Sequence, residues 1–226
     1  MTNNLKTIGI SLIATAMILS SCGSQKPAME IVFSDANLYN DATVENIDGT
    51  QVLSLGESDG FYDLTAEAGA LISTLEDYTI SVKYKLSSSN DLRGYGHFLF
   101  AFSQLAENSA EEGPYLAFRL NEQRYEISNG GYQHEQIIMS GTPAPKDVWV
   151  HVLYRQSGRT GELYFNGELI GTNDNMMIPA QVFETAPEFC WIGKAPFRGD
   201  KYLSSVQVKE FKIFNRYLTD KEVAEL

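Results

Sequence analysis

An all-β sandwich or barrel is the fold class that this sequence predicts, and three observations predict it. Short apolar runs alternate with turn residues along most of the chain, a spacing typical of many short strands. Apolar and polar residues alternate strictly over 78–86, which is the period of a strand with one buried face. Asn166-Gly167 separates two apolar runs and favours a type I′ hairpin turn, because that turn needs positive φ at both residues. The chain has 226 residues, a length that all-β folds often form as one domain.

The individual strands follow from the same signals. The clearest one places five apolar residues on a single face: Tyr78, Ile80, Val82, Tyr84 and Leu86. The run 97–102 is apolar almost throughout, which predicts a central strand buried on both faces. Other strands are expected wherever apolar runs lie between turn signals, at 115–120, 124–128, 148–154, 161–171 (a hairpin), 189–192 and 205–214. The last of these has no clean apolar face.

Helix signals are scarce. Residues 65–75 are compatible with one short turn or helix. At the end of the chain, Thr219 and Glu222 have the spacing of a capping box, and Asp220 suits the positive end of a helix. Most aromatic residues, including Trp149, are expected in the core because they lie in the strongest strands: Phe98, Phe100, Phe102, Tyr164, Phe211 and Phe214.

The N-terminal residues are typical of a targeting segment. Lys6 precedes an apolar run over 8–19 that is too short to span a membrane and has the length of a signal peptide. Residues 19–22, Leu-Ser-Ser-Cys, resemble the bacterial lipobox, which implies cleavage before Cys22 and lipidation of its thiol. We therefore expect a signal peptide over 1–21, a lipidated cysteine and tether over 22–29, and one domain over 30–226, anchored outside the cytoplasm. The alternative is an ordinary secretory signal with a chance cysteine.

Charge and cysteine content restrict the partners. The net charge of −12 and the pI near 4.7 exclude nucleic acid as a plausible partner, because phosphate binding needs clustered lysine and arginine. Cys190 lies in an apolar strand and is expected to behave as a small buried hydrophobe. A disulfide between Cys190 and Cys22 is the alternative.

Several stretches together resemble one family. The strand at 78–84, the pair formed by 149–152 and the 163–171 hairpin, and the ending that runs from 191–194 to 208–223 are similar to bacterial laminin G-like domains of the concanavalin A-like lectin/glucanase superfamily. The resemblance covers 30–226 and implies a jelly roll of two antiparallel sheets, one of them concave. It also implies a Bacteroidetes lipoprotein, since such modules accompany polysaccharide-degrading enzymes in those bacteria. No catalytic domain is expected to follow.

Many relatives hold a structural Ca²⁺, an ion that prefers six to eight oxygen ligands. Aspartates in turns are the candidate ligands here: Asp48, Asp59, Asp63, Asp174 and Asp200. Their spacing identifies no site, so no cofactor is assigned and a structural Ca²⁺ stays the candidate.

The superfamily also includes glycoside hydrolases and polysaccharide lyases. The Glu-x-Asp-x-x-Glu strand that would bring two carboxylates together is absent from the sequence, as is the Gln-Ile-His lyase pattern. His97, His134 and His151 lie in no nucleophile motif and have no metal-ligand spacing. We expect no catalysis, with an unrecognised active site as the alternative.

Two segments carry candidate ligand-binding residues. Arg119 alternates with apolar neighbours and therefore faces away from the core, and Arg124, Tyr132 and His134 follow within one hairpin and loop. The alternative for these four is a solvated sheet face with Arg–Glu pairs. Phe197 and Arg198 lie in the loop 194–202, where simple loop packing is the alternative.

The sequence thus predicts a non-catalytic, carbohydrate-binding envelope lipoprotein that takes part in polysaccharide utilisation. Its partners would be a glycan and, through the lipid alone, a membrane. A protein–protein interaction module of the envelope is the second hypothesis, and a glycan-active enzyme with an unfamiliar site is the third.

Overall fold

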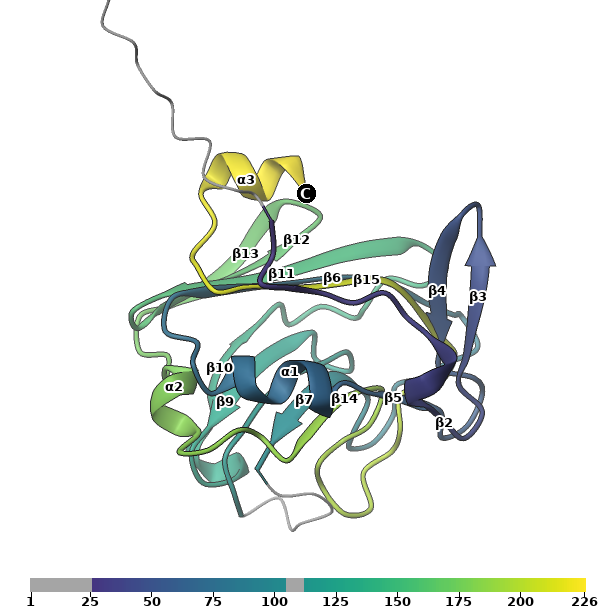
Figure 1. Ribbon diagram of the computed structural model, residues 1–226, viewed down its shortest axis with the longest axis horizontal. Helices are drawn as coiled ribbons and strands as arrows, with labels where there is room; N and C mark the ends of the chain where they lie inside the picture. The colour runs from purple at the N-terminus through teal and green to yellow at the C-terminus, as the bar shows by residue number, and fades with distance from the viewer. Residues whose placement is uncertain (1–25, 105–111) are drawn as a thin grey trace, which may run out of the picture.

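Two antiparallel β-sheets pack face to face in the computed structural model, which describes residues 26–104 and 112–226 (Figure 1). The predicted sandwich is confirmed. One sheet has eight strands, in the order β13 (Glu168–Asn173), β12 (Thr160–Phe165), β11 (Trp149–Ser157), β6 (Tyr78–Leu86), β15 (Val206–Phe214), β4 (Thr50–Ser54) and β3 (Thr43–Ile47), with β1 (Met29–Glu30) also paired to β15. The other has seven, in the order β10 (Gln136–Met139), β9 (Arg124–Ser128), β8 (Tyr115–Arg119), β7 (Phe98–Ser103), β14 (Phe189–Ile192), β5 (Phe61–Asp63) and β2 (Leu38–Tyr39).

Helices are short and lie outside the two sheets. They are α1 (Thr65–Ile72), α2 (Pro179–Val182), α3 (Asp220–Glu225) and the 3₁₀ turns η1 (Asp35–Asn37) and η2 (Tyr132–His134). The capping box at α3 is confirmed: the Glu222 amide donates to Thr219 Oγ1 at 3.4 Å, and the Thr219 amide donates to the Glu222 carboxylate at 2.8 Å. Over the described ranges, each helix is too short or too polar to cross a membrane.

The central strands follow the predicted pattern. β6 spans the predicted residues, and its five apolar residues face the core. β7 lies in the middle of its sheet, and all six of its residues are buried. β15 has no clean apolar face in sequence because a β-bulge between Val208 and Glu210 changes the side-chain parity, so that Val208 and Phe211 both point inward.

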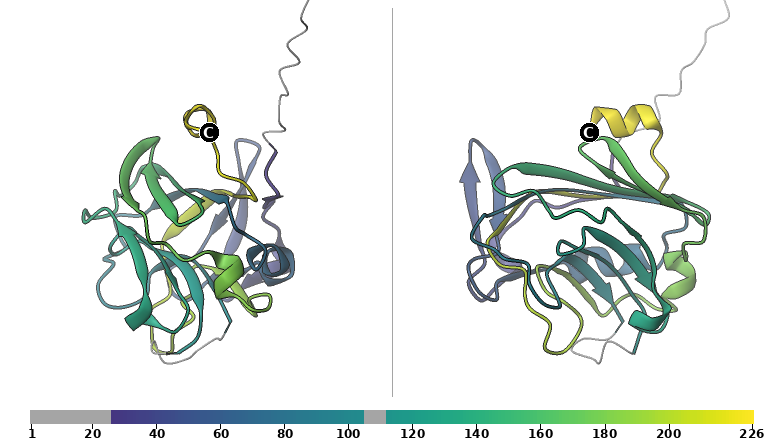
Figure 2. Two further views of the ribbon diagram at one scale, coloured as in Figure 1. Left: turned by 90° about the vertical axis from the view of Figure 1, so that its left-hand side faces the viewer. Right: turned by 180° about the vertical axis from the view of Figure 1, so that it is seen from behind.

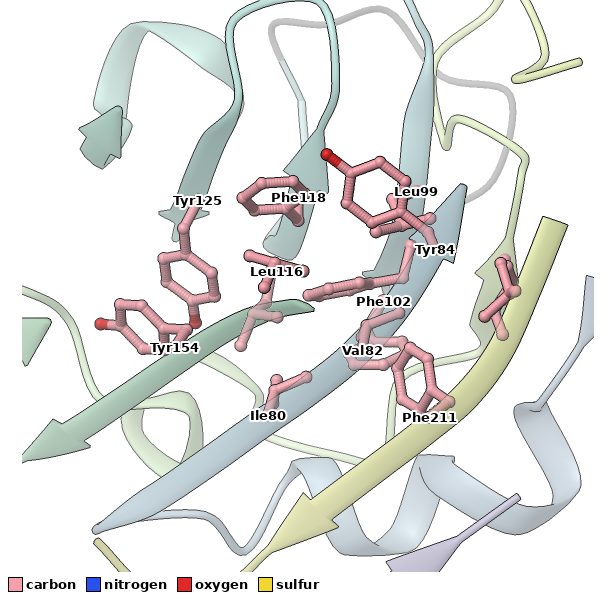
Figure 3. Close-up of a cluster of buried hydrophobic side chains, with 14 of the residues drawn as sticks. Ile80, Val82, Tyr84, Leu99, Phe102, Leu116, Phe118, Tyr125, Tyr154 and Phe211 are labelled. Atoms are coloured by element: carbon pink, nitrogen blue, oxygen red, sulfur yellow. The ribbon is translucent and has the colours of Figure 1, made fainter. Parts of the chain in front are cut away.

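The core between the sheets is rich in aromatic rings (Figure 3). Phe100 and Phe102 of one sheet lie edge-on to Phe211 of the other, with centroids 5.5 and 6.4 Å apart. At one end of the core, the hydroxyls of buried tyrosines form hydrogen bonds with one another and with Gln156. The Tyr154 hydroxyl donates to the side-chain oxygen of Gln156 at 2.6 Å. This pairing allows polar atoms to be buried at little cost.

The hairpin between β12 and β13 forms at the predicted turn. Asn166 and Gly167 have φ of 49° and 80°, the left-handed conformations that a type I′ turn requires. The amide side chain of Asn166 also accepts from the His151 amide at 2.8 Å, which ties the turn to β11.

One core assignment is wrong. Trp149 is half-buried on the outer face of the eight-stranded sheet, where Lys209 Nζ lies 4.3 Å from its ring centroid. The reason is strand parity, because Val150 and Val152 take the inward positions of β11. Cys190 is a free thiol that points inward from β14 with no exposed surface, and burial raises its pKa. The expected partner or lipid site, Cys22, lies outside the described residues.

Candidate functional site

Two arginines face each other on the outer face of the seven-stranded sheet. β8 and β9 pair so that Arg119 lies directly opposite Arg124. Their neighbours in each strand, Phe118 and Tyr125, point into the core, so alternation directs both arginines outward as predicted for Arg119. Like charges opposite each other destabilise a strand pair, and this pair therefore needs a counterion.

The counterion is a buried glutamate. Glu126 has no exposed surface, and its Oε2 accepts from Arg119 Nε at 3.0 Å and from Arg124 Nε at 2.6 Å. Arg124 Nη2 also donates to Glu135 at 2.8 Å, and the Tyr115 hydroxyl donates to the other oxygen of Glu135. Burial raises the pKa of Glu126, and Arg124 opposes that rise. These contacts fix both guanidinium groups in place.

A pocket of about 450 Å³ lies over this network. We call it the arginine pocket, and seven residues line it: Tyr95, Arg119, Arg124, Tyr132, Glu135, Phe197 and Asp200. Tyr95 is 80% exposed and Tyr132 is 49% exposed. Phe197 packs edge-on against Phe98 and Tyr115, with centroids 5.9 and 5.0 Å apart, and so is held at the pocket wall. Exposed aromatic faces beside fixed hydrogen-bonding groups are suited to a polar ligand with apolar patches.

Loops from distant parts of the chain complete the pocket. The segment after β14 lies on the side of the seven-stranded sheet that faces away from the other sheet (Figure 2). Its Lys201 amide donates to the Tyr95 carbonyl at 3.1 Å, and the His97 amide donates to the Lys201 carbonyl at 3.1 Å. Gly96 makes this approach possible, because a Cβ there would lie 2.2 Å from the Lys201 carbonyl oxygen. Tyr95 and Asp200 are thereby brought to the same pocket.

Asp200 differs from the other acids of the pocket. Burial raises the pKa of its carboxyl to about 6. Among the described residues, its carboxylate has no hydrogen bond or ion pair. An ionised carboxylate without a partner is a strong acceptor for a ligand hydroxyl.

The predicted binding residues divide into two groups. Arg119, Arg124, Tyr132 and Phe197 came from two separate segments and line one pocket. His134 and Arg198 are exposed and are not among the lining residues, so their role in binding stays a prediction. We did not predict Tyr95, Glu135 or Asp200 as ligand-binding residues. For Tyr95 the available signal was an aromatic residue between two glycines, Gly94 and Gly96, which marks an exposed loop.

The predicted alternative of Arg–Glu pairing is also part of this site. Both arginines do pair with glutamates, but on a mostly buried surface rather than a solvated one: their side chains are only 13% and 12% exposed. The pairing therefore positions the arginines at the pocket floor.

A serine and a histidine lie together elsewhere. Ser81 Oγ and His151 Nε2 are 2.8 Å apart on the outer face of the eight-stranded sheet, and burial lowers the pKa of His151 to about 4. Ser81 has no exposed surface, so a substrate cannot reach its hydroxyl. The two side chains belong to the packing on this face of the sheet, and the serine hydroxyl is not accessible as a nucleophile.

Among the described residues no cluster of carboxylates marks a site for the calcium ion considered from the sequence, and that ion stays a prediction. Over 26–104 and 112–226, no three His, Cys, Asp or Glu side chains converge on a point that could hold a metal. Asp63 instead accepts from the Thr65 amide at 2.8 Å, and Asp200 lies in the arginine pocket. A metal role for these aspartates stays a prediction.

A family model described as the concanavalin A-like lectin/glucanases superfamily, of the laminin G type, matches residues 56–224. The chain belongs to this superfamily. No curated protein matches the chain. The chain shares its fold with domain 4 of an extracellular arabinanase from Geobacillus stearothermophilus, which was solved in complex with arabinotriose. The two are 13% identical and superpose with a TM-score of 0.60, over 83% of this chain and 81% of that chain.

Two further solved structures are similar to this superfamily member. One is the carbohydrate-binding module (CBM40) of the IT-sialidase of Ruminococcus gnavus bound to α2,3-sialyllactose, at 17% identity and a TM-score of 0.60 over 77% of this chain and 95% of that one. The other is the ligand-binding domain of botulinum neurotoxin serotype D in complex with N-acetylneuraminic acid, at 14% identity and a TM-score of 0.56 over 89% of this chain and 50% of that one. At these identities the likeness establishes the jelly-roll fold alone.

Proposed function

We propose that this protein is a non-catalytic carbohydrate-binding module of the cell envelope and that it binds glycans in the arginine pocket. The observation that carries the proposal is the pocket itself, where two exposed tyrosines lie beside two arginines fixed by a buried glutamate. Tyrosine rings can stack on the apolar face of a sugar, and the fixed guanidinium, carboxylate and hydroxyl groups can bind its hydroxyls. The glycan complexes of the similar structures support the choice of ligand class.

The test is a glycan array followed by titration calorimetry with the full-length chain. We expect reproducible binding of at least one oligosaccharide. Tyr132→Ala should weaken it by about tenfold, since stacking contacts of an aromatic ring contribute on the order of 1–2 kcal/mol. Tyr39→Ala is the matched control, because Tyr39 is 48% exposed and does not line the pocket. Equal effects of the two substitutions, or no binding of any neutral or acidic glycan, would contradict the proposal and favour the protein-partner hypothesis.

Anchoring through Cys22 is a separate part of the proposal. It is supported by the apolar run and the lipobox-like residues 19–22. Metabolic labelling with a tagged fatty acid should mark the wild-type chain in a bacterial host and should not mark Cys22→Ala. A wild-type chain that takes up no label would remove the anchor and leave a secreted binding protein, and label that persists in Cys22→Ala would place the lipid at another residue.

A role in polysaccharide utilisation extends the same proposal. It rests on the resemblance to modules that accompany polysaccharide-degrading enzymes. If it holds, the glycan that binds best should be a fragment of a polymer on which the host bacterium grows, and growth on that polymer should slow when the chain is deleted.

A further inference from the structure

Carboxylates outnumber guanidinium groups in and around the arginine pocket. Besides Glu126 and Glu135, the rim residue Glu122 lies 3.5 Å from Arg119 Nη2 and 3.3 Å from Arg124 Nε. With Asp200, four carboxylates thus accompany two guanidiniums. Glu122, Glu126 and Glu135 pair with the two arginines and balance their positive charge, so Asp200 adds a negative charge to the lining of the pocket.

Asp200 is an acid of the pocket lining that has no ion pair with any cation in the part of the chain that the structure describes. The other lining groups that carry charge are Arg119, Arg124 and Glu135, and the arginines are held by Glu126 and Glu135 instead. Its neighbour Lys201 donates to the Arg93 carbonyl at 2.7 Å. The half-buried Asp200 carboxylate is therefore available to accept ligand hydroxyls, and its charge acts on any anion placed in the same pocket.

We infer that the arginine pocket selects uncharged oligosaccharides over sugars that carry a carboxylate, and that Asp200 sets this selectivity. The inference rests on the proposed function. A hydroxyl of a neutral sugar donates to Asp200, which relieves an unpaired acceptor. A sugar carboxylate in a pocket of this size meets Asp200 at close range in a medium of reduced dielectric constant, which corresponds to at least about a tenfold loss of affinity.

The first experiment compares matched pairs of glycans that share one skeleton and differ in whether the carboxyl group is ionised or esterified. Suitable pairs are the methyl ester of sialyllactose with sialyllactose, the methyl ester of glucuronosyl-xylotriose with its free acid, and methyl-esterified trigalacturonate with its free acid. In titrations of the full-length chain near neutral pH, the neutral member of every pair that binds should bind at least about tenfold tighter. An acidic member that binds equally or more tightly would overturn the inference while the proposed function stands. Binding of no member would overturn both.

The second experiment assigns the selectivity to Asp200. Asp200→Asn keeps an acceptor oxygen but removes the charge, so the preference for the neutral glycan should shrink by about tenfold. Asp174→Asn, at an exposed turn outside the pocket, should leave the preference unchanged. An Asp200→Asn variant with the wild-type preference would overturn the role of Asp200.

A pH series gives an independent readout. The pKa of Asp200 is about 6, so its carboxyl is largely protonated near pH 5, whereas a sugar carboxylate stays ionised there. The wild-type preference should therefore fall between about pH 7.5 and pH 5, and that of Asp200→Asn should not. Parallel pH profiles of the two proteins would contradict the assignment, because Arg119, Arg124 and Glu135 are shared by both.

Discussion

Glu126 is a single carboxylate between two guanidiniums that face each other across β8 and β9. Its position at the centre of a strand is one that acidic residues rarely occupy unless they are paired. Because Glu126 already holds both arginines in place, these side chains lose little conformational freedom when a ligand binds, and this favours affinity. The same side chain therefore contributes to stability and to the preorganisation of the pocket.

Glu126→Ala should lower the free energy of unfolding by about 3–5 kcal/mol, because it leaves two mostly buried guanidiniums in mutual repulsion. Urea denaturation at neutral pH measures the loss. Glu122→Ala is the matched control: Glu122 contacts the same arginines but is 46% exposed, so its loss should stay below about 1 kcal/mol. Similar small losses for both would mean that the buried carboxylate is not the main counterion.

The sequence predicted some of these residues and not others for a physical reason. The outward direction of Arg119 follows from the period of two in a strand, which is a local property. Tyr95 and Asp200 reach the pocket from separate loops that meet through the contacts between Gly96 and Lys201. No local pattern encodes that meeting, and the acidic character of Asp200 alone suggested a metal ligand instead.

At the level of elements, most strands with strong local signals were predicted and most strands without them were missed. β6, β9 and β14 occupy the predicted residues because alternation or an apolar run marks each one. β10 was missed because it is a four-residue edge strand, whose half-exposed residues show no alternation. β1 and β2 form through pairing with the more distant strands β15 and β5, which outweighs their weak intrinsic propensity. β3 and β4 instead form a hairpin whose turn residues Asp48 and Gly49 have φ of 51° and 82°, a local signal that our sequence prediction missed.

The turn between β12 and β13 allows the effect of backbone strain on stability to be measured separately from side-chain contacts. Gly167 has a φ of 80°, and a Cβ at that position would meet no atom within 4 Å. Gly167→Ala should therefore lower the free energy of unfolding by about 1 kcal/mol through strain alone. Glu168→Ala, at the next and exposed position, should change it by less than about 0.5 kcal/mol. A Gly167→Ala protein as stable as wild type in urea would show that the turn relaxes to another type.

The capping box of α3 should give a defined pH dependence. Hydrogen bonds from Arg216 and Thr219 lower the pKa of Glu222 to about 2, against about 4.3 in an unfolded chain. Because the folded pKa is lowered, the stabilisation is present above about pH 4.3 and is lost as the pH falls towards about 2. Solvent screening limits it to about 1 kcal/mol.

Glu222→Gln should therefore be less stable than wild type near neutral pH, and the difference should vanish towards pH 2. Urea midpoints measured over a pH series check this convergence. Glu168→Gln serves as the control, since Glu168 is exposed on β13. A difference between Glu222→Gln and wild type that is independent of pH would exclude an ionised capping carboxylate.

At the scale of the whole described fold, its first strand, β1, and the arginine pocket belong to different sheets. β1 enters the fold on the eight-stranded sheet, where it pairs with β15, and α3 packs over the same sheet (Figure 1). The arginine pocket lies on the outer face of the seven-stranded sheet. A chain tethered through Cys22, as proposed, would thus hold its pocket on the side away from the attachment point.

This arrangement predicts that a membrane does not block the site. Wild-type chain in lipid vesicles and a soluble chain of residues 23–226 should bind a given glycan with affinities equal to within about twofold, for a trisaccharide and for a long polymer alike. Titration of both forms with the two ligand sizes measures this. The polymer is the sensitive probe, because a pocket near the lipid surface would still admit a trisaccharide while excluding a chain that extends on both sides. Loss of polymer binding in the vesicle-bound form alone would place the pocket towards the membrane and contradict the orientation.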